Sequence, residues 1–287
     1  MGSWAHRTTT LINLGDAEVH MAESAKIVAE GARKVFPSAG EAVVAIDELS
    51  LTVPEGEFLS IVGPSGCGKT TFLRALAGLE RLSSGRLEIA QADPTRPLNS
   101  VVFQEYGIFP WKTVRQNVAF GLQMRGIGRR ERDERARQWI ERVGLRDFTD
   151  AYPHELSGGM KQRVSIARAL ANDPEVLLMD EPLGALDAQT RAVMQEEFLH
   201  LWEWDQKTVV YITHSIDEAV FLSDRVVVMT AHPGRSKAIH DIDLPRPRSW
   251  DQTGSTQFSE LRLRIWEDLQ DEVKRTMGVQ ADTAEQP

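Results

Sequence analysis

The sequence predicts an α/β fold built on a largely parallel β-sheet, and three observations support this prediction. Short apolar runs at residues 58–62, 176–179, 209–213 and 226–229 alternate with segments of helical periodicity. A glycine-rich loop directly follows the first of these runs. A polar, mostly helical segment at 112–152 separates two stretches of the alternating pattern, which predicts an inserted helical subdomain. Strands that alternate with helices are typical of parallel sheets, which bind ligands at the carboxyl ends of their strands.

Composition and charge narrow the class of protein. The chain has 287 residues, of which 41% are apolar and 26% charged, as in ordinary soluble globular proteins. The net charge of −9 argues against nucleic-acid binding as the main role. Apolar runs are far shorter than the roughly 20 residues that span a bilayer, so we expect any membrane role to be peripheral. The single cysteine, Cys67, excludes a disulfide framework within the chain and fits a reducing cytoplasm.

The amino-terminal part is expected to be an extension followed by an edge sheet. Residues 1–25 lack the continuous apolar stretch of a signal peptide, and we expect a loosely ordered extension there. Residues 43–46 and 49–53 have the composition of strands, and we assign them to an antiparallel edge sheet. Residues 54–57 (PEGE) form a turn that leads into the buried strand at 58–62.

The glycine-rich loop matches a phosphate-binding motif. It fits the pattern G-x-x-x-x-G-K-[ST], with a strand before it and a helix at 70–79 after it, as the motif requires. Glycines let backbone N–H groups approach phosphates closely, and a helix start adds about half a positive charge. Lys69 is expected to reach the β- and γ-phosphates, and the Thr70 hydroxyl to bind Mg²⁺. Small-residue packing explains Cys67 in this loop better than a reactive thiol does. The residues predicted to bind nucleotide are Gly63, Pro64, Ser65, Gly66, Cys67, Gly68, Lys69, Thr70 and Thr71.

Polar residues follow three other predicted strands. Asp180 offers a carboxylate of the kind that Mg²⁺ prefers. Glu181, one residue further, is a candidate to polarise an attacking water. Gln104 is a candidate for contact with both Mg²⁺ and that water, and His214 is a candidate to contact the γ-phosphate and orient Glu181.

A second glycine-rich segment, Ser157-Gly158-Gly159, precedes a helix that begins near Met160. It offers a hydroxyl, backbone N–H groups and a helix N-terminus to an anion. No lysine directly follows its last glycine, so it cannot replace the first loop. This asymmetry predicts half of a site that another molecule completes.

The carboxyl-terminal part has a different character. Residues 244–248 (LPRPR) cannot form a regular helix. Residues 256–274 are predicted to be helical, with an apolar stripe made by Phe258, Leu261, Ile265, Leu269 and Val273. Docking of this stripe on the main domain is the simpler interpretation, and a dimer contact is the alternative.

Together these motifs resemble those of the ATP-binding cassette (ABC) ATPases. The matching motifs are Walker A at 63–70, the Q-loop at Gln104, the signature at 156–163, Walker B at 176–182, the D-loop at 185–187 and the H-loop at His214. The resemblance covers roughly residues 27–250 and implies a P-loop NTPase core with an edge antiparallel β-subdomain and an inserted helical subdomain. We therefore divide the chain into an ABC ATPase domain at 26–250, with its helical subdomain at about 105–170, and a C-terminal helix and tail at 251–287.

The resemblance implies an ATPase that binds ATP and Mg²⁺ and pairs head to tail with a second copy of itself. The implied catalytic residues are Glu181, His214 and Gln104, and the implied Mg²⁺ ligands are Thr70, Gln104 and Asp180. The residues implied to act in trans, on ATP bound by the partner, are Ser157, Gly158, Gly159, Gln162 and Asp187. Phe36 stands where the family carries an aromatic residue that stacks on adenine, although residues 37–40 are additional here, and Val44 is a second candidate for contact with the base.

Smaller motifs resemble those of the importers of nitrate, sulfonates and taurine, at residues 103–114, 232–235 and 244–248. They imply a transmembrane permease as a partner, a peripheral position at the cytoplasmic face of the inner membrane, and an indirect link to a solute-binding protein. Phe109 and Trp111 are either anchors for the permease or core residues. The alternative is a non-transport ABC ATPase of the chromosome-maintenance or translation type. The short gap between the Q-loop and the signature, and the single cassette, argue against it.

Overall fold

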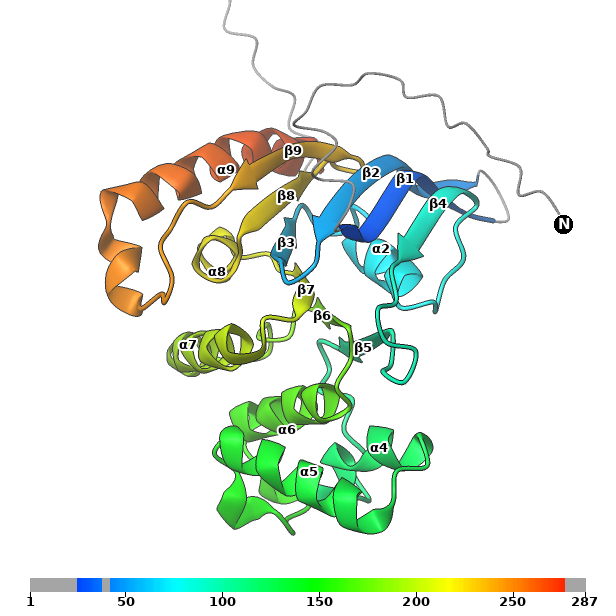
Figure 1. Cartoon of the computed structure of the whole chain (residues 1–287). Helices are drawn as coiled ribbons and strands as arrows, with labels where there is room; N and C mark the ends of the chain where they lie inside the picture. Colours follow the sequence, from blue (N-terminus) through cyan, green and yellow to red (C-terminus); the bar gives the residue numbers. More distant parts are fainter. Residues whose placement is uncertain (1–24, 38–41, 277–287) are drawn as a thin grey trace, which may run out of the picture.

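Two β-sheets organise the chain in the computed structural model, which describes residues 25–37 and 42–276 (Figure 1). The expected extension at residues 1–25 lies almost wholly outside these ranges. The larger sheet has the order β5-β6-β7-β3-β8-β9. Its pairs are parallel except that of β8 with β9. Its strands are β3 (Phe58–Val62), β5 (Asn99–Val102), β6 (Val176–Asp180), β7 (Thr208–Ile212), β8 (Arg225–Met229) and β9 (Ser236–Asp241). The predicted parallel sheet is thus confirmed.

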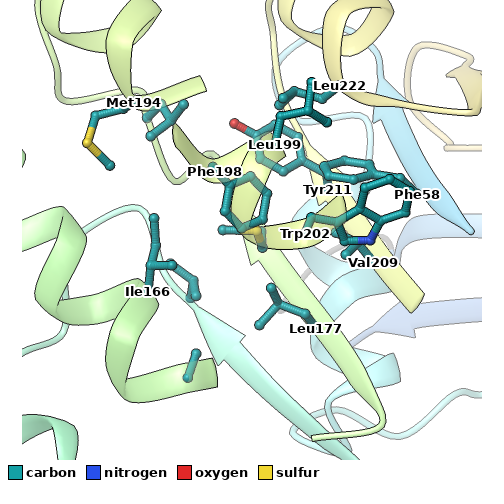
Figure 2. Close-up of a cluster of buried hydrophobic side chains, with 14 of the residues drawn as sticks. Phe58, Ile166, Leu177, Met194, Phe198, Leu199, Trp202, Val209, Tyr211 and Leu222 are labelled. Atoms are coloured by element: carbon teal, nitrogen blue, oxygen red, sulfur yellow. The ribbon is translucent and has the colours of Figure 1, made fainter. Parts of the chain in front are cut away.

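The central strands of this sheet are buried along their whole length. Every residue of β3, β6 and β7 is buried, as expected for parallel strands covered on both faces. Phe58 packs edge-on against Phe198 and Trp202 of α7 (Ala188–Asp205), with ring centroids 5.9 and 5.4 Å apart (Figure 2). This aromatic cluster fixes α7 on one face of the sheet.

The smaller sheet is antiparallel, with the order β2-β1-β4. Its strands are β1 (Ala25–Phe36), β2 (Val43–Pro54) and β4 (Ser84–Ile89). The two strands that the sequence predicted at 43–46 and 49–53 form one strand, β2, which continues through an irregular pairing near Glu48, where φ is 51°. The helix α2 (Lys69–Leu76) contacts strands of both sheets and is shorter than the predicted 70–79. Its apolar face therefore joins the two sheets.

A helical layer lies at the opposite end of the molecule from the antiparallel sheet (Figure 1). Its α-helices are α3 (Val114–Val118), α4 (Phe120–Met124), α5 (Arg129–Arg142) and α6 (Gly158–Ala171), with 3₁₀ helices η1 (Arg146–Phe148) and η2 (Pro153–Glu155). The charged run of α5 faces outward, and the helix buries Ala136, Trp139 and Ile140. These helices occupy the segment in which the sequence predicted a helical subdomain.

The carboxyl-terminal helix packs on the main domain. This helix, α9 (Thr256–Thr276), contacts α8 (Ile216–Leu222), β8 and β9, and follows the 3₁₀ helix η3 (Trp250–Gly254). Four residues of the predicted stripe are buried in the main hydrophobic cluster, namely Phe258, Leu261, Ile265 and Leu269. The docking interpretation of this stripe is therefore confirmed. In the described part of the chain, no helix combines the length and the apolar character needed to cross a membrane.

The proline-arginine segment before α9 closes the end of α8. Arg248 is buried, and its guanidinium donates to the carbonyls of Val220, Phe221 and Ser223 at 3.2, 3.0 and 2.8 Å. Burial lowers the pKa of Arg248 to about 10, so the side chain stays protonated at neutral pH. The last turn of a helix carries unsatisfied carbonyls, and this buried cation satisfies them.

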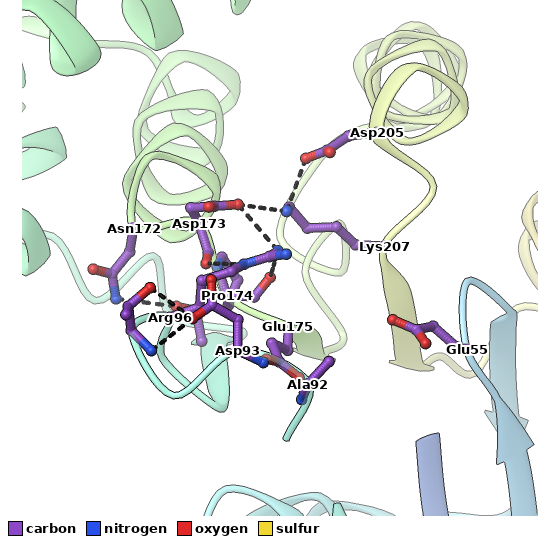
Figure 3. Close-up of polar contacts among 12 residues, drawn as sticks. Glu55, Ala92, Asp93, Arg96, Asn172, Asp173, Pro174, Glu175, Asp205 and Lys207 are labelled. Atoms are coloured by element: carbon purple, nitrogen blue, oxygen red, sulfur yellow. Dashed lines mark hydrogen bonds and ion pairs between the residues drawn. The ribbon is translucent and has the colours of Figure 1, made fainter. Parts of the chain in front are cut away.

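A buried ion pair joins the two sheets. Lys26 of β1 contacts Glu175, the residue before β6, and both side chains are 2% exposed. Glu175 also accepts hydrogen bonds from the N–H groups of Ala92 and Asp93, at 2.9 and 2.6 Å. Figure 3 shows this carboxylate beside a second network, in which Asp173 pairs with Lys207 at 2.7 Å. Burial raises the pKa of Glu175, but the bonds from Lys26 and the two amides outweigh burial and lower the pKa to about 2.

We expect Glu175→Ala to lower the free energy of unfolding at pH 7 by about 3–5 kcal/mol, because it leaves the buried Lys26 ammonium with only the distant carboxylate of Glu55, which lies 3.9 Å away and is 66% exposed. Urea denaturation measures this change. The carboxylate stabilises the fold fully above pH 4.5, its ordinary pKa, and this contribution is lost as the pH falls toward 2. The difference between wild type and variant should therefore shrink below pH 4.5.

Glu88→Ala is the matched control, because the pair of Glu88 with Arg86 is exposed. It should change stability little. An equal loss of stability in the two variants would contradict the importance of the buried pair.

Candidate functional site

The predicted phosphate loop connects β3 to α2 and borders a cavity of about 260 Å³. Two of its glycines have left-handed backbone conformations, with φ of 76° at Gly66 and 102° at Gly68. A Cβ on Gly68 would lie 2.5 Å from the carbonyl oxygen of Ala45, so only glycine fits there. The residues that line the cavity are Val43, Ala45, Ser65, Gly66, Cys67, Gly68, Lys69, Thr70, Thr71, Glu181, His214 and His232.

Lys69 is buried at the start of α2, under the loop. Its ammonium donates to the carbonyls of Gly63 and Pro64 at 2.8 and 2.9 Å. These partners are neutral, so they orient the positive charge without cancelling it. Together with the N-terminus of α2, Lys69 makes the cavity attractive to an anion. The neighbouring Cys67 is 1% exposed, and burial raises the pKa of its thiol, which disfavours the reactive thiolate.

The candidate cation ligands meet at the end of β6. The Thr70 hydroxyl donates to a carboxylate oxygen of Asp180 at 3.0 Å. Burial raises the pKa of Asp180, against the opposing effect of the bond from Thr70. A hydroxyl and a desolvated carboxylate side by side fit a hard cation such as Mg²⁺, which phosphate oxygens would also coordinate.

Glu181 lies at the centre of a polar triad at the same edge of the sheet. Its φ of 47° is unusual for a non-glycine residue, and its N–H donates to the carbonyl of Ile212 on β7 at 3.0 Å. One carboxylate oxygen accepts from the Gln104 side chain at 3.3 Å, and the other lies 2.5 Å from Nε2 of His214. Strained backbones of this kind often occur at functional sites. The structure thus brings together the three residues that the sequence selected as catalytic.

The second glycine-rich segment begins helix α6 and lies away from this cavity. The Ser157 hydroxyl accepts from the N–H of Met160 at 3.3 Å and caps the helix. A Cβ on Gly158 would lie 2.9 Å from the Tyr106 hydroxyl. Neither Ser157 nor the two glycines after it line the phosphate cavity of their own chain.

Two residues that the family resemblance implies to act in trans, Gln162 and Asp187, make contacts within their own chain in this structure. Gln162 is fully buried in α6, and its amide atoms have no hydrogen-bond partner among the described residues. It therefore does not lie on the exposed start of α6 with Ser157, because the helical turn directs it inward. Asp187 caps α7 and accepts from the N–H groups of Gln189 and Thr190 at 3.1 and 3.0 Å. The bonds from Thr190 lower the pKa of Asp187 most.

Neither of the two residues expected to contact the base, Phe36 and Val44, lines the phosphate cavity. Phe36 ends β1 opposite Val43, and the Lys34 ammonium lies 4.6 Å from its ring centroid. Phe36 is not among the residues that line the cavity, whereas Val43 and Ala45 are. Side chains alternate along a strand, so the intervening Val44 lies on the other face of β2.

His232 lines the cavity, and the sequence analysis did not select it. It belongs to the turn between β8 and β9, far from the glycine loop in sequence. The sequence analysis used residues 232–235 only as a motif that resembles the importers, without a role at the nucleotide site. The proximity of His232 to the loop is a consequence of strand order, because β8 pairs with β3.

Comparison with known proteins gives a consistent set of similarities. The family model described as "ABC transporter" matches residues 46–184. An uncharacterized ABC transporter ATP-binding protein of Methanocaldococcus jannaschii is 52% identical over 254 residues, which cover 88% of this chain and 94% of that protein. A taurine import ATP-binding protein of Rhizobium johnstonii is 48% identical over 235 residues, with 79% and 89% covered. A solved dimeric ATP-binding cassette with bound ADP and Pi has a TM-score of 0.67 and 31% identity, and covers 76% of this chain and 100% of that one.

Proposed function

The chain belongs to the ABC transporter family of ATP-binding proteins, and we propose that it is the ATP-hydrolysing subunit of an importer for a small solute such as taurine, a sulfonate or nitrate. The observation that carries this proposal is the Glu181 triad beside the phosphate loop. The name of the taurine import relative supports the solute class. The chain would be a peripheral subunit that energises a membrane permease from the cytoplasmic face of the inner membrane. A solute-binding protein would be an indirect partner.

The phosphate loop and the polar triad have complementary roles in the proposed reaction. The loop N–H groups and Lys69 hold the β- and γ-phosphates of ATP. Glu181 orients or deprotonates the water that attacks the γ-phosphate, while His214 and Gln104 fix its carboxylate. Mg²⁺, held by Thr70, Asp180 and Gln104, would supply charge neutralisation at the phosphates. The protein contributes mainly positioning and electrostatic stabilisation.

The active assembly in this proposal is a head-to-tail dimer of two copies. Ser157 and the glycines after it would complete the ATP site of the partner. They do not line the phosphate cavity of their own chain, which supports this arrangement, as does the dimeric state of the solved cassette. To move a dimer from mostly open to mostly closed, ATP must favour the closed form by about 5.5 kcal/mol.

The permease is proposed to dock beside the loop that follows Gln104. Trp111 is 70% exposed, so its ring is available to a partner. Phe109 instead packs on Phe120, with ring centroids 4.6 Å apart, and lies 5.6 Å from the ring of Trp111. Exposed tryptophans frequently contribute most of the binding energy of an interface, and the packing of Phe109 would hold the Trp111 ring in position. The helices between the Q-loop and the signature are short, which argues against the chromosome-maintenance alternative.

Glu181→Gln should bind ATP and hydrolyse it at least about 10²-fold more slowly, because the amide cannot accept a proton. The variant should then accumulate as an ATP-bound dimer. Steady-state phosphate release and size-exclusion chromatography with ATP and Mg²⁺ measure these two properties. Lys69→Ala is the control and should lose ATP binding. A Glu181→Gln variant that stays monomeric with ATP, or that turns over normally, would contradict the proposal.

Sharing of the site between subunits can be tested by mixing two inactive variants. Lys69→Ala removes the phosphate grip, and Ser157→Asp keeps a capping side chain on α6 but repels phosphate. In the mixed dimer one site combines an intact loop with an intact Ser157, so about a quarter of the wild-type ATPase activity should return. Lys69→Ala mixed with a chain that carries both changes should stay inactive. No recovery in the first mixture would contradict a site completed in trans.

Trp111→Ala should leave the ATPase activity of the isolated chain within about twofold, since its ring lies outside the phosphate cavity. It should lower the amount of chain that sediments with membrane vesicles containing the permease. Trp204→Ala is the matched control, because Trp204 is 66% exposed and lies on α7. Equal retention of Trp111→Ala and wild type on the vesicles would remove Trp111 from the interface.

A further inference from the structure

The turn between β8 and β9 is fixed against the phosphate loop. The N–H of Gly234 donates to the carbonyl of Ala45 at 3.1 Å, and its own carbonyl accepts from the N–H of Asp47 at 2.9 Å. A Cβ on Gly234 would lie 2.0 Å from the carbonyl oxygen of Cys67, inside the loop. No side chain other than hydrogen fits in this contact. The position of the turn relative to the loop is therefore set by backbone contacts.

His232 lies two residues before this contact, at the border of two cavities. It lines the phosphate cavity together with Ser65, and the same two residues line a second cavity of about 560 Å³. Arg235 and Arg275 also border the second cavity. The imidazole is exposed and shares both cavities with Ser65 of the phosphate loop, so it can donate a hydrogen bond to an anion held there.

The C-terminal helix fixes the residue next to His232. Glu272 of α9 is 1% exposed, and its carboxylate accepts from the N–H of Ala231 at 2.8 Å. The same carboxylate pairs with Lys237 at 3.1 Å and with Arg275 at 3.0 Å. Burial raises the pKa of Glu272, but the bonds from Ala231 and Lys237 outweigh it and lower the pKa. Glu272 is thus a charged, fully bonded anchor for one side of the turn.

We propose that His232 is a nucleotide-contacting residue of this site and that Glu272 is a positioning residue that holds the turn carrying it. The imidazole donates to a phosphate oxygen of the bound nucleotide from the side of the loop opposite Glu181. Two cations, Arg235 and Arg275, and one carboxylate, Glu272, line the second cavity beside His232, which favours an anion there. This inference rests on the proposed function, because ATP is the ligand that it names.

Binding of ATP and Mg²⁺ measured by calorimetry, in a Glu181→Gln background that prevents turnover, tests the contact. His232→Ala should raise the Kd for ATP about tenfold, the usual effect of losing one hydrogen bond to a charged group. Its thermal midpoint should match that of its parent, since the imidazole is exposed. An unchanged Kd would overturn the inference.

Three variants of α9 test the positioning role. Glu272→Ala should raise the Kd for ATP about threefold, a smaller effect than direct loss of the contact. Glu272→Gln, whose amide oxygen can still accept from Ala231, should restore the Kd. Asp268→Asn is the matched control, because Asp268 ties α9 to His240 of β9 at 2.8 Å without contacting the turn. A Kd for Asp268→Asn as high as that for Glu272→Ala would reduce Glu272 to general support of the helix and overturn its positioning role.

The outcomes also separate this inference from the proposed function. If the parent binds ATP and Lys69→Ala does not, the nucleotide site stands whatever His232→Ala shows. If Lys69→Ala binds ATP as tightly as the parent does, the proposed nucleotide site is contradicted, independently of the result for His232→Ala. Should Glu272→Ala not fold, Glu272→Gln and His232→Ala still decide the question, because the first keeps an acceptor and the second alters only an exposed side chain.

Discussion

The parallel pairing of β5, β6, β7 and β3 is the constraint on which the rest of the structure depends. Parallel strands that run in one layer end at one edge, so the residues that follow them meet there. Gln104, Glu181 and His214 are far apart in sequence, yet each follows one of these strands. The phosphate loop follows a fourth strand of the same layer. Burial of the central strands on both faces makes this edge rigid, which a positioned carboxylate requires.

Much of the site was predictable from sequence because it consists of short motifs whose chemistry is local. The residues of the loop, Asp180 and the Glu181 triad lie where the sequence placed them. The burial of Gln162 was not predictable, because the motif gives a residue type but not the face of α6 on which it falls. His232 was named only within the importer-like motif at 232–235, because its place beside the phosphate loop depends on the pairing of β8 with β3, which no local pattern records. The sequence predicted two strands where the structure has one, β2, because the polar pair Asp47-Glu48 interrupts the apolar pattern; Glu48 adopts a left-handed φ of 51° within the strand.

The two glycine-rich segments differ in the way they are held. The first is fixed between β3 and α2 by buried contacts and contains a buried lysine. The second begins α6 of the helical layer, and its Ser157 is exposed. In the proposed head-to-tail dimer, each site would combine one rigid half with one half on a separate layer, and could therefore respond to the spacing between subunits. This difference suits an enzyme whose hydrolysis must be tied to the movement of another protein.

The capping hydroxyl of Ser157 has a consequence for which side chains the segment tolerates. A hydroxyl has one hydrogen and two lone pairs, and the bond from the N–H of Met160 occupies only a lone pair. The hydroxyl hydrogen stays free to point outward. The same atom could therefore cap the N-terminus of α6 and donate a hydrogen bond to a phosphate in the proposed dimer. Aspartate and asparagine also cap helices, but aspartate would bring a second negative charge and asparagine a longer side chain. Serine and threonine combine a short capping oxygen with an uncharged donor on the same atom, whereas aspartate offers no donor and asparagine donates only from its longer amide.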